Sequence, residues 1–157
     1  HKNLVLTSDA AKGMFDVVYS CGSFEHFADP KAILVTMRDY LRPGGTLIVT
    51  FAEPWLSPHG SHMDGITRLP WVNILFRERD VLAVRSLYRK DGATRYEEVE
   101  GGLNRMTVAR FERLIHGSGM DVVYTRLLAV KRLPLVTRIP LLRELLTASC
   151  TAVLVKR

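Results

Sequence analysis

The chain has 157 residues, of which 47% are hydrophobic, so it is long enough for one domain with a buried core. No run reaches the roughly 18 apolar residues of a membrane-spanning helix and no secretory signal is visible, so we expect a cytoplasmic protein without stable insertion into a membrane. The net charge is +6 at pH 7, and the excess of Lys and Arg lies toward the C-terminal end of the chain. We interpret these residues as a solvated basic face rather than a surface for nucleic acid or anionic lipid. Cys21 and Cys150 lie far apart and lack the spacing of a metal site, which favours free thiols over a disulfide.

The first predicted strand runs from Asn3 to Thr7, and Ser8-Asp9-Ala10 ends it. A short polar link leads to residues 15–51, which predict a βαβ unit. Phe15–Ser20 is apolar, β-branched and aromatic, as is typical of a strand buried on both faces. Asp29-Pro30 is a helix start, Pro43-Gly44-Gly45 ends that helix with a sharp turn, and Thr46–Phe51 is a second buried strand. The unit implies a parallel pair of strands joined by a right-handed crossover.

Ligands of open parallel sheets bind beyond the carboxyl ends of the strands. The loop after the first strand of this unit carries Ser20, Cys21, Gly22, Ser23, Glu25 and His26. The stretch after the second strand carries Glu53, Trp55, His59 and His62. Two His-bearing loops at one edge of an apolar sheet indicate a site.

Residues 52–76 show little periodicity and contain three prolines and two tryptophans. A loop of this length without regular structure is usually a lid or a binding loop. His59 and His62, three residues apart, could act as a base or bind a metal, with Asp64 as the only further ligand near by. We favour a base or a substrate contact over a metal, and two surface histidines without function remain the alternative.

The rest of the chain predicts two helices and two strands. A helix is expected from Phe76 to Tyr88, and a second one begins after the N-cap Thr107 and stops before Gly117. The expected strands are Met120–Leu127 and Ala148–Val155, with a basic, proline-broken segment and a short helix between them.

The segment FDVVYSCGSFEHFADPKAIL, followed by LRPGGTLIVTF, resembles the central part of class I S-adenosylmethionine-dependent methyltransferases of the small-molecule type. The resemblance covers most of the chain but only the second half of the family's domain. It implies an α/β fold with a Rossmann-like, mostly parallel sheet that is incomplete at its N-terminal side. The last strand would be antiparallel and lie between the two strands before it. Residues 1–157 would be a partial methyltransferase domain, with residues 52–76 as a substrate-side loop insertion.

The resemblance also implies S-adenosylmethionine as the cofactor. Asp9 and Ala10 would lie beside its adenine, because an Asp carboxylate accepts a hydrogen bond from an exocyclic amine. Ser20, Cys21 and Gly22 would be further cofactor-binding residues. A role of Asp9 as the cap of a turn remains an equal alternative.

The glycine-rich turn that should bind this cofactor is not found in the sequence. We therefore expect these 157 residues to be part of a longer protein, and to bind S-adenosylmethionine weakly or not at all by themselves. Without further strands, Phe15–Ser20 would expose an apolar edge. A homodimer through that edge, or a rearranged Asn3–Thr7 strand, could cover it.

Methyl transfer to a hydroxyl requires a base that removes the hydroxyl proton. We expect His59 or His62 to be this base and His26 to contact cofactor or substrate, with a small molecule as the acceptor and no metal. The alternative is a non-catalytic relative or fragment that binds no cofactor alone and is stabilised by dimerisation. A dinucleotide-linked oxidoreductase would need a glycine fingerprint that is not found here, and a nucleic-acid substrate is disfavoured because no aromatic and basic platform follows Phe15–Ser20.

Overall fold

The structure is a computed structural model that describes residues 12–132 and 139–157. The predicted strand Asn3–Thr7 and the predicted cofactor residues Asp9 and Ala10 lie outside the described residues. None of the helices in the described ranges is long and apolar enough to cross a membrane.

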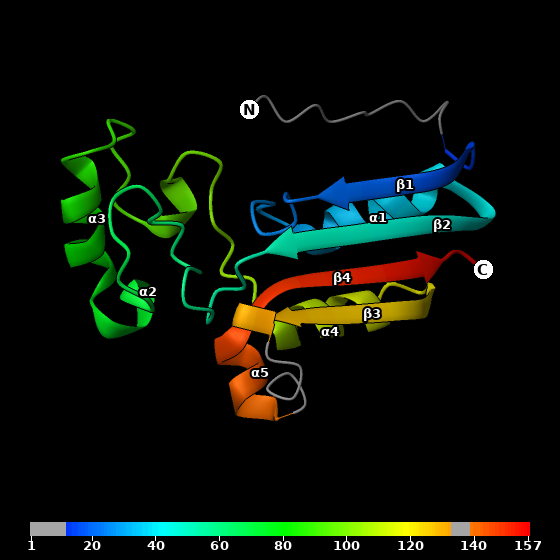
Figure 1. The fold of residues 1–157 in the computed structure, drawn as a ribbon. Coiled ribbons are helices and arrows are strands. Elements are labelled where there is room, and N and C mark those ends of the chain that lie inside the picture. The colour runs from blue at the N-terminus through cyan, green and yellow to red at the C-terminus, as the bar shows by residue number, and fades with distance from the viewer. Residues whose placement is uncertain (1–11, 133–138) are drawn as a thin grey trace.

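In this part of the chain four strands form one sheet, in the order β1-β2-β4-β3 (Figure 1). They are β1 (Phe15–Cys21), β2 (Leu41–Ala52), β3 (Asp121–Ala129) and β4 (Thr147–Val155). β1 and β2 are parallel, whereas β4 is antiparallel to both of its neighbours, β2 and β3. β1, β2 and β3 therefore run in one direction, and β4 runs in the opposite direction between β2 and β3. This confirms the predicted Rossmann-like α/β fold.

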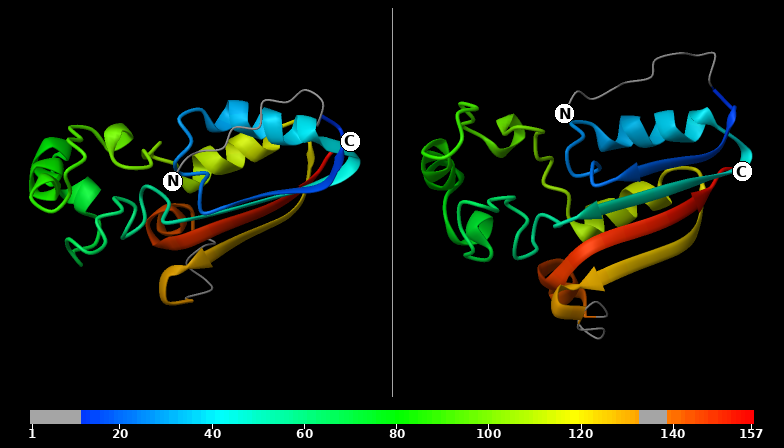
Figure 2. Two further views of the ribbon diagram at one scale, coloured as in Figure 1. Left: turned by 90° about the horizontal axis from the view of Figure 1, so that it is seen from above. Right: turned by 45° about the horizontal axis from the view of Figure 1, so that its top comes forward.

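Two helices cover one face of the sheet, and both start with the predicted caps. In α1 (Pro30–Tyr40), Asp29 Oδ1 accepts the Ala32 N–H at 3.0 Å, and in α4 (Val108–His116), Thr107 Oγ1 accepts the Arg110 N–H at 3.1 Å. Figure 2 shows both helices on the same side of the sheet. A third helix, α5 (Pro140–Leu146), supports α4, because Glu144 accepts the N–H groups of Val108 and Ala109 at 3.1 and 2.7 Å.

The core lies between the sheet and these two helices. Its centre consists of Phe24 from the loop after β1, Phe51 from β2 and Phe111 from α4, each at most 1% exposed. The ring of Phe111 lies edge-on to those of Phe51 and Phe24, with centroids 5.0 and 5.6 Å apart. The loop that follows β1 is therefore anchored in the core by its own aromatic side chain.

The prediction that residues 15–20 are buried on both faces is wrong for the described chain. Val17 and Tyr19 are 54% and 73% exposed, while Ser20, which faces the helices, is buried. The reason is that α1 and α4 cover only one face of the sheet, and β1 pairs with β2 alone among the described strands. An apolar, β-branched sequence indicates a strand but does not show how many of its faces are covered.

Two predicted boundaries also differ. β2 begins at Leu41, five residues before the predicted Thr46, because the chain pairs with Phe15 directly after α1. The helix predicted over Phe76–Tyr88 is α3 (Glu78–Ser86), preceded by the short α2 (Val72–Leu75), and Phe76 and Arg77 between them are extended. The elements thus agree in type and differ at their ends.

Residues 53–106 build a second apolar cluster outside the sheet. It consists of Met63, Val72, Val81, Leu82, Tyr96, Val99 and Leu103 and involves α2, α3 and the 3₁₀ turn η2 (Tyr96–Glu98). In Figure 1 this segment lies beyond the carboxyl ends of β1 and β2, where sheets of this kind bind their ligands.

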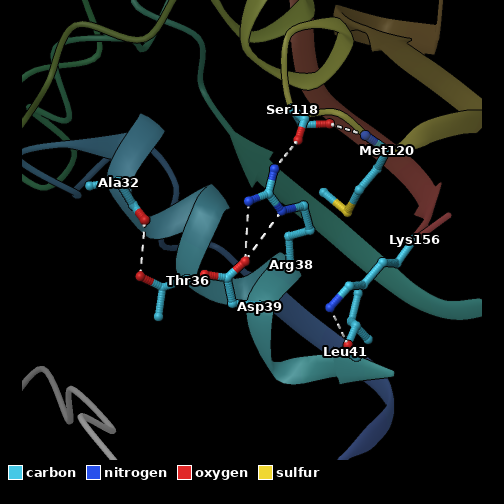
Figure 3. Close-up of polar contacts among 8 residues, drawn as sticks. All are labelled: Ala32, Thr36, Arg38, Asp39, Leu41, Ser118, Met120 and Lys156. Carbon is cyan, nitrogen blue, oxygen red and sulfur yellow. Dashed lines mark hydrogen bonds and ion pairs between the residues drawn. The ribbon is translucent and has the colours of Figure 1, made fainter. Parts of the chain in front are cut away.

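Polar contacts connect α1 with the far end of the sheet (Figure 3). Arg38 Nη1 donates to the Ser118 carbonyl at 3.1 Å, and Arg38 also pairs with Asp39 at 3.2 Å. Lys156 Nζ, just after β4, donates to the Leu41 carbonyl at 2.6 Å. Of the predicted site residues that the structure describes, none lies at this end of the molecule.

Candidate functional site

The two predicted loops meet at the carboxyl edge of the parallel strands. The rings of His26, after β1, and His62, after β2, have centroids 5.4 Å apart and planes at 87°. These two residues are 36 positions apart in the sequence, so only the parallel pairing of β1 with β2 brings their loops together.

The loop that carries Glu25 and His26 is held by a second segment, residues 102–104. The Asn104 side-chain amide donates to the carbonyls of Phe24 and Phe27, both at 2.8 Å, and the Asn104 N–H donates to the Glu25 carbonyl at 2.9 Å. The ring nitrogen Nδ1 of His26 lies 2.6 Å from the Gly102 carbonyl. Because a carbonyl only accepts hydrogen bonds, Nδ1 carries the proton and donates it, and Nε2 faces Glu25 Oε1 at 4.0 Å.

A small, partly open cavity with room for about one water-sized group lies at this junction. Its walls are Glu25, Glu53, Trp55, Gly60, His62, Leu103, Arg105 and Met106. Gly60 is required here, because a Cβ atom at this position would lie 2.4 Å from the Trp55 carbonyl oxygen.

Three of the residues around this cavity have left-handed backbone conformations that side chains disfavour. The φ angles of Glu53, His62 and Arg105 are 54°, 51° and 55°. A left-handed conformation at a non-glycine residue costs of order 1 kcal/mol, and such residues cluster at functional sites. These three residues come from separate parts of the chain and line one cavity. Their backbone conformations therefore support a site here, whatever side chains they carry.

The acidic and imidazole groups here are perturbed by burial. Burial raises the pKa of the Glu25 carboxyl above its ordinary value, and the nearby His26 partly offsets this increase. Burial also raises the pKa of Glu53, and repulsion from Asp64 adds to it. Burial lowers the pKa of His62, and the neighbouring His26 lowers it further, so His62 is neutral at pH 7.

Besides the ion-paired Arg105 Nε, two polar atoms beside the cavity have no hydrogen-bond partner. They are Glu25 Oε2 and His62 Nε2, both buried, and the nearest anion to His62 Nε2 is Glu53 Oε2 at 3.7 Å, beyond hydrogen-bond distance. A buried polar atom without a partner costs about 1–3 kcal/mol, so these atoms are poised for a ligand group.

The positive charge beside the cavity belongs to Arg105, and it is already neutralised. Its Nη2 lies 3.0 Å from both carboxylate oxygens of Glu78, and its Nε lies 2.9 Å from Glu97 Oε1. The guanidinium carbon also lies 5.4 Å from the ring centroid of Trp55. Arg105 therefore forms a fixed wall between two acids and an aromatic ring.

The predicted catalytic histidines are separated by the structure. His26 and His62 lie together, whereas the side chain of His59 is 46% exposed, lies 3.8 Å from Asp64 and does not line the cavity. Within residues 12–132 and 139–157 no group of three or more His, Cys, Asp or Glu residues is placed to hold a metal ion.

The predicted cofactor residues of the first loop lie at the end of β1. Ser20 is buried and its Oγ has no hydrogen-bond partner, Cys21 is an exposed free thiol, and the Gly22 N–H donates to the Thr50 carbonyl at 2.9 Å. Gly22 has a φ of 58° and open space where a Cβ atom would be. Sequence reasoning missed Arg105 and its partners Glu78 and Glu97, because nothing in the local pattern of a charged stretch indicates which charges converge on a cavity.

Replacing Glu25 by glutamine is expected to raise the free energy of unfolding at pH 7 and to change it little near pH 4. A carboxyl whose folded-state pKa is raised stabilises the fold below its unfolded value of 4.5, and this stabilisation is lost as the pH rises through the folded-state pKa. Glutamine removes the buried charge and therefore the loss. Urea unfolding at both pH values measures the effect, with the exposed Glu100→Gln as a control that should change neither. Destabilisation by Glu25→Gln at pH 7 would contradict the burial argument.

Comparisons with known proteins point to one family. Residues 4–49 match the family described as "Methyltransferase domain". No curated protein matches the sequence.

Three solved structures with a similar fold are described as methyltransferases. An S-adenosylmethionine-dependent methyltransferase from Mesorhizobium loti is 16% identical, with a TM-score of 0.52, and the match covers 92% of this chain and 64% of that one. A possible histamine N-methyltransferase from Thermotoga maritima is 13% identical, with a TM-score of 0.51, over 94% of this chain and 58% of that one. Phosphoethanolamine N-methyltransferase 2 from Haemonchus contortus, in complex with phosphomonomethylethanolamine and S-adenosylhomocysteine, is 11% identical, with a TM-score of 0.52, over 93% of this chain and 34% of that one.

This chain therefore spans between about a third and two thirds of the length of these three proteins. At such low identity the structural likeness concerns the fold alone, and the sequence match to a methyltransferase domain covers residues 4–49. Residues 4–49 thus match a methyltransferase domain, and the fold of the chain is similar to that of S-adenosylmethionine-dependent methyltransferases.

Proposed function

We propose that the protein transfers a methyl group from S-adenosylmethionine to a hydroxyl of a small-molecule acceptor. The observation that carries this proposal is the meeting of His26 and His62, 5.4 Å apart, at the carboxyl edge of the parallel strands. Substrates of a methyl transfer must meet at one place, and here two loops with perturbed titratable groups converge in a methyltransferase fold.

The residues proposed to hold the cofactor are Asp9, Ala10, Ser20, Cys21 and Gly22. The described members suit a polar ligand, because Ser20 Oγ is buried without a partner and Gly22 leaves open space beside the chain. When bound, S-adenosylmethionine supplies an electrophilic methyl group on a sulfonium.

His62 is the proposed base. Its lowered pKa keeps the imidazole neutral at pH 7, and its Nε2 has no hydrogen-bond partner, so it can take the proton of an acceptor hydroxyl as the new O–C bond forms. Glu53 Oε2, 3.7 Å from Nε2, would then stabilise the imidazolium. His26, fixed by the Gly102 carbonyl, is proposed to contact the cofactor or the acceptor, and the exposed His59 is the weaker candidate for the base.

The substrate-side segment is proposed to extend beyond residues 52–76. Residues 53–106 share one apolar cluster and lie over the carboxyl ends of β1 and β2. After Glu53 they also supply six of the cavity walls, namely Trp55, Gly60, His62, Leu103, Arg105 and Met106. This segment would therefore select the acceptor.

The test is transfer of labelled methyl groups. The full-length protein is incubated with methyl-labelled S-adenosylmethionine and fractionated pools of small metabolites, and label in a new small molecule is the expected result. Labelled cofactor that is neither bound nor consumed, with every pool, would support the non-catalytic alternative.

The exposed edge of β1 favours that alternative, since Val17 and Tyr19 are exposed and β1 pairs on one side only among the described strands. A homodimer through this edge would pair the free backbone groups of β1 and extend the sheet beside these two side chains. Light scattering of the purified protein, compared with a Val17→Lys variant, tests this. A dimer that the lysine disrupts is expected, and an equally stable dimer in the variant would place the contact elsewhere.

A further inference from the structure

We propose that the acceptor carries a positively charged amino group, and that the cavity between Glu25 and Glu53 binds this group. The inference rests on the proposed function, because it takes the cavity beside His62 to face the acceptor. It concerns how the acceptor is recognised and leaves the methylated atom as the hydroxyl.

The first argument is the carboxylate of Glu25. The residue is 6% exposed and lines the cavity, and its Oε2 has no hydrogen-bond partner. The donors near by are already used, since the Asn104 amide is bound to two carbonyls and His26 Nδ1 is bound to the Gly102 carbonyl. A buried carboxylate oxygen at a cavity wall is satisfied best by a charged donor, because such hydrogen bonds are about twice as strong as neutral ones.

The second argument is the balance of charge around the cavity. The chain carries a net charge of +6, yet the cavity walls include two acids and one cation. That cation, Arg105, is paired with Glu78 and Glu97. His62 is neutral at pH 7, and Asp64 adds a further negative charge near Glu53. The surplus is therefore negative, which suits a cation and opposes a phosphate or a carboxylate.

The third argument is size and wall chemistry. The cavity has room for about one water-sized group, far less than the roughly 300–1,000 Å³ of sites that enclose a whole small ligand, so it fits only the amino end of the acceptor. Trp55, Leu103 and Met106 supply apolar walls that would contact the methylene groups next to an ammonium. A bare metal ion fits less well, because no cluster of three ligating side chains exists within residues 12–132 and 139–157.

A pair of probes that differ only in charge tests the inference. The affinities of 6-aminohexan-1-ol and hexane-1,6-diol for the full chain are measured by ligand-observed NMR, without cofactor. The amino alcohol is expected to bind at least about tenfold tighter, as one charge-assisted hydrogen bond would give. Equal affinities, or no binding of the amino alcohol up to about 20 mM, would overturn the proposal.

Variants assign the preference to the cavity. Glu25→Gln keeps the shape of the side chain and is expected to reduce the preference to within about twofold. Glu53→Gln, at a side chain that is 31% exposed, is expected to reduce it as well and places no buried group at risk during folding. The exposed Glu100→Gln should retain the full preference. A preference that survives both Glu25→Gln and Glu53→Gln would show that the amino group binds elsewhere.

The outcome is independent of methyl transfer. A charge preference that depends on Glu25, in a protein that methylates no acceptor, would refute the proposed function and leave the cation site in place. Methyl transfer to neutral acceptors, with no preference between the two probes, would refute this inference alone.

Discussion

Replacement of His62 by alanine is expected to lower turnover by at least about 10²-fold, because the acceptor hydroxyl loses the group that takes its proton. The side chain is mostly buried, its Nε2 is unpartnered, and it lies between His26 and Glu53. His59→Ala, at an exposed side chain outside the cavity walls, is the matched control and should retain turnover within about threefold. Release of S-adenosylhomocysteine with the acceptor found by labelling measures both variants.

A pH profile separates a base from a packing role. Burial lowers the pKa of His62, so the neutral, active form persists below the ordinary histidine range, and turnover should fall only at a pH below that range. This acidic decline should disappear in the residual activity of His62→Ala. A profile of the same shape in both proteins would remove His62 from the proton transfer, whatever the loss in rate.

Truncation of Phe111 to alanine is expected to cost about 3–5 kcal/mol of unfolding free energy. The ring is 1% exposed and contacts both Phe51 of β2 and Phe24 of the loop before Glu25, with centroids 5.0 and 5.6 Å away. The change removes the aromatic contact between α4, the sheet and that loop and leaves a cavity. Urea unfolding monitored by circular dichroism gives the midpoint and the slope.

Phe76→Ala is the control for this truncation, because Phe76 is 51% exposed between α2 and α3 and contributes to no buried cluster. It is expected to change the unfolding free energy by no more than about 0.5 kcal/mol. A loss below about 1.5 kcal/mol in Phe111→Ala would mean that the three rings do not form the centre of the core.

The core and the site are physically connected through the loop after β1. Phe24 packs in the core, Glu25 and His26 follow at once, and Asn104 binds the carbonyls on both sides of them. Phe24 therefore stabilises the fold, whereas the neighbouring Glu25 lowers its stability at pH 7 by keeping a buried carboxylate at a cavity. Such a division is expected where a site is positioned by a rigid scaffold.

The sequence by itself determined the elements whose signals are local. Asp29-Pro30 and Thr107 cap the helices where expected, because capping depends on residues within one helical turn. The order of strand, helix and strand over residues 15–51 was likewise sufficient to predict that β1 and β2 are parallel. It also predicted the edge of the sheet where His26 and His62 meet.

Tertiary structure alone decided three further features. It covered one face of β1 and left Val17 and Tyr19 exposed, because coverage depends on helices far away in the chain. It brought Arg105 to the cavity through pairs with Glu78 and Glu97, which no spacing could indicate. It also separated His62 from His59, although the sequence gives no reason to distinguish these two histidines. The backbone at His62 is left-handed, with a φ of 51°, and directs the chain differently there.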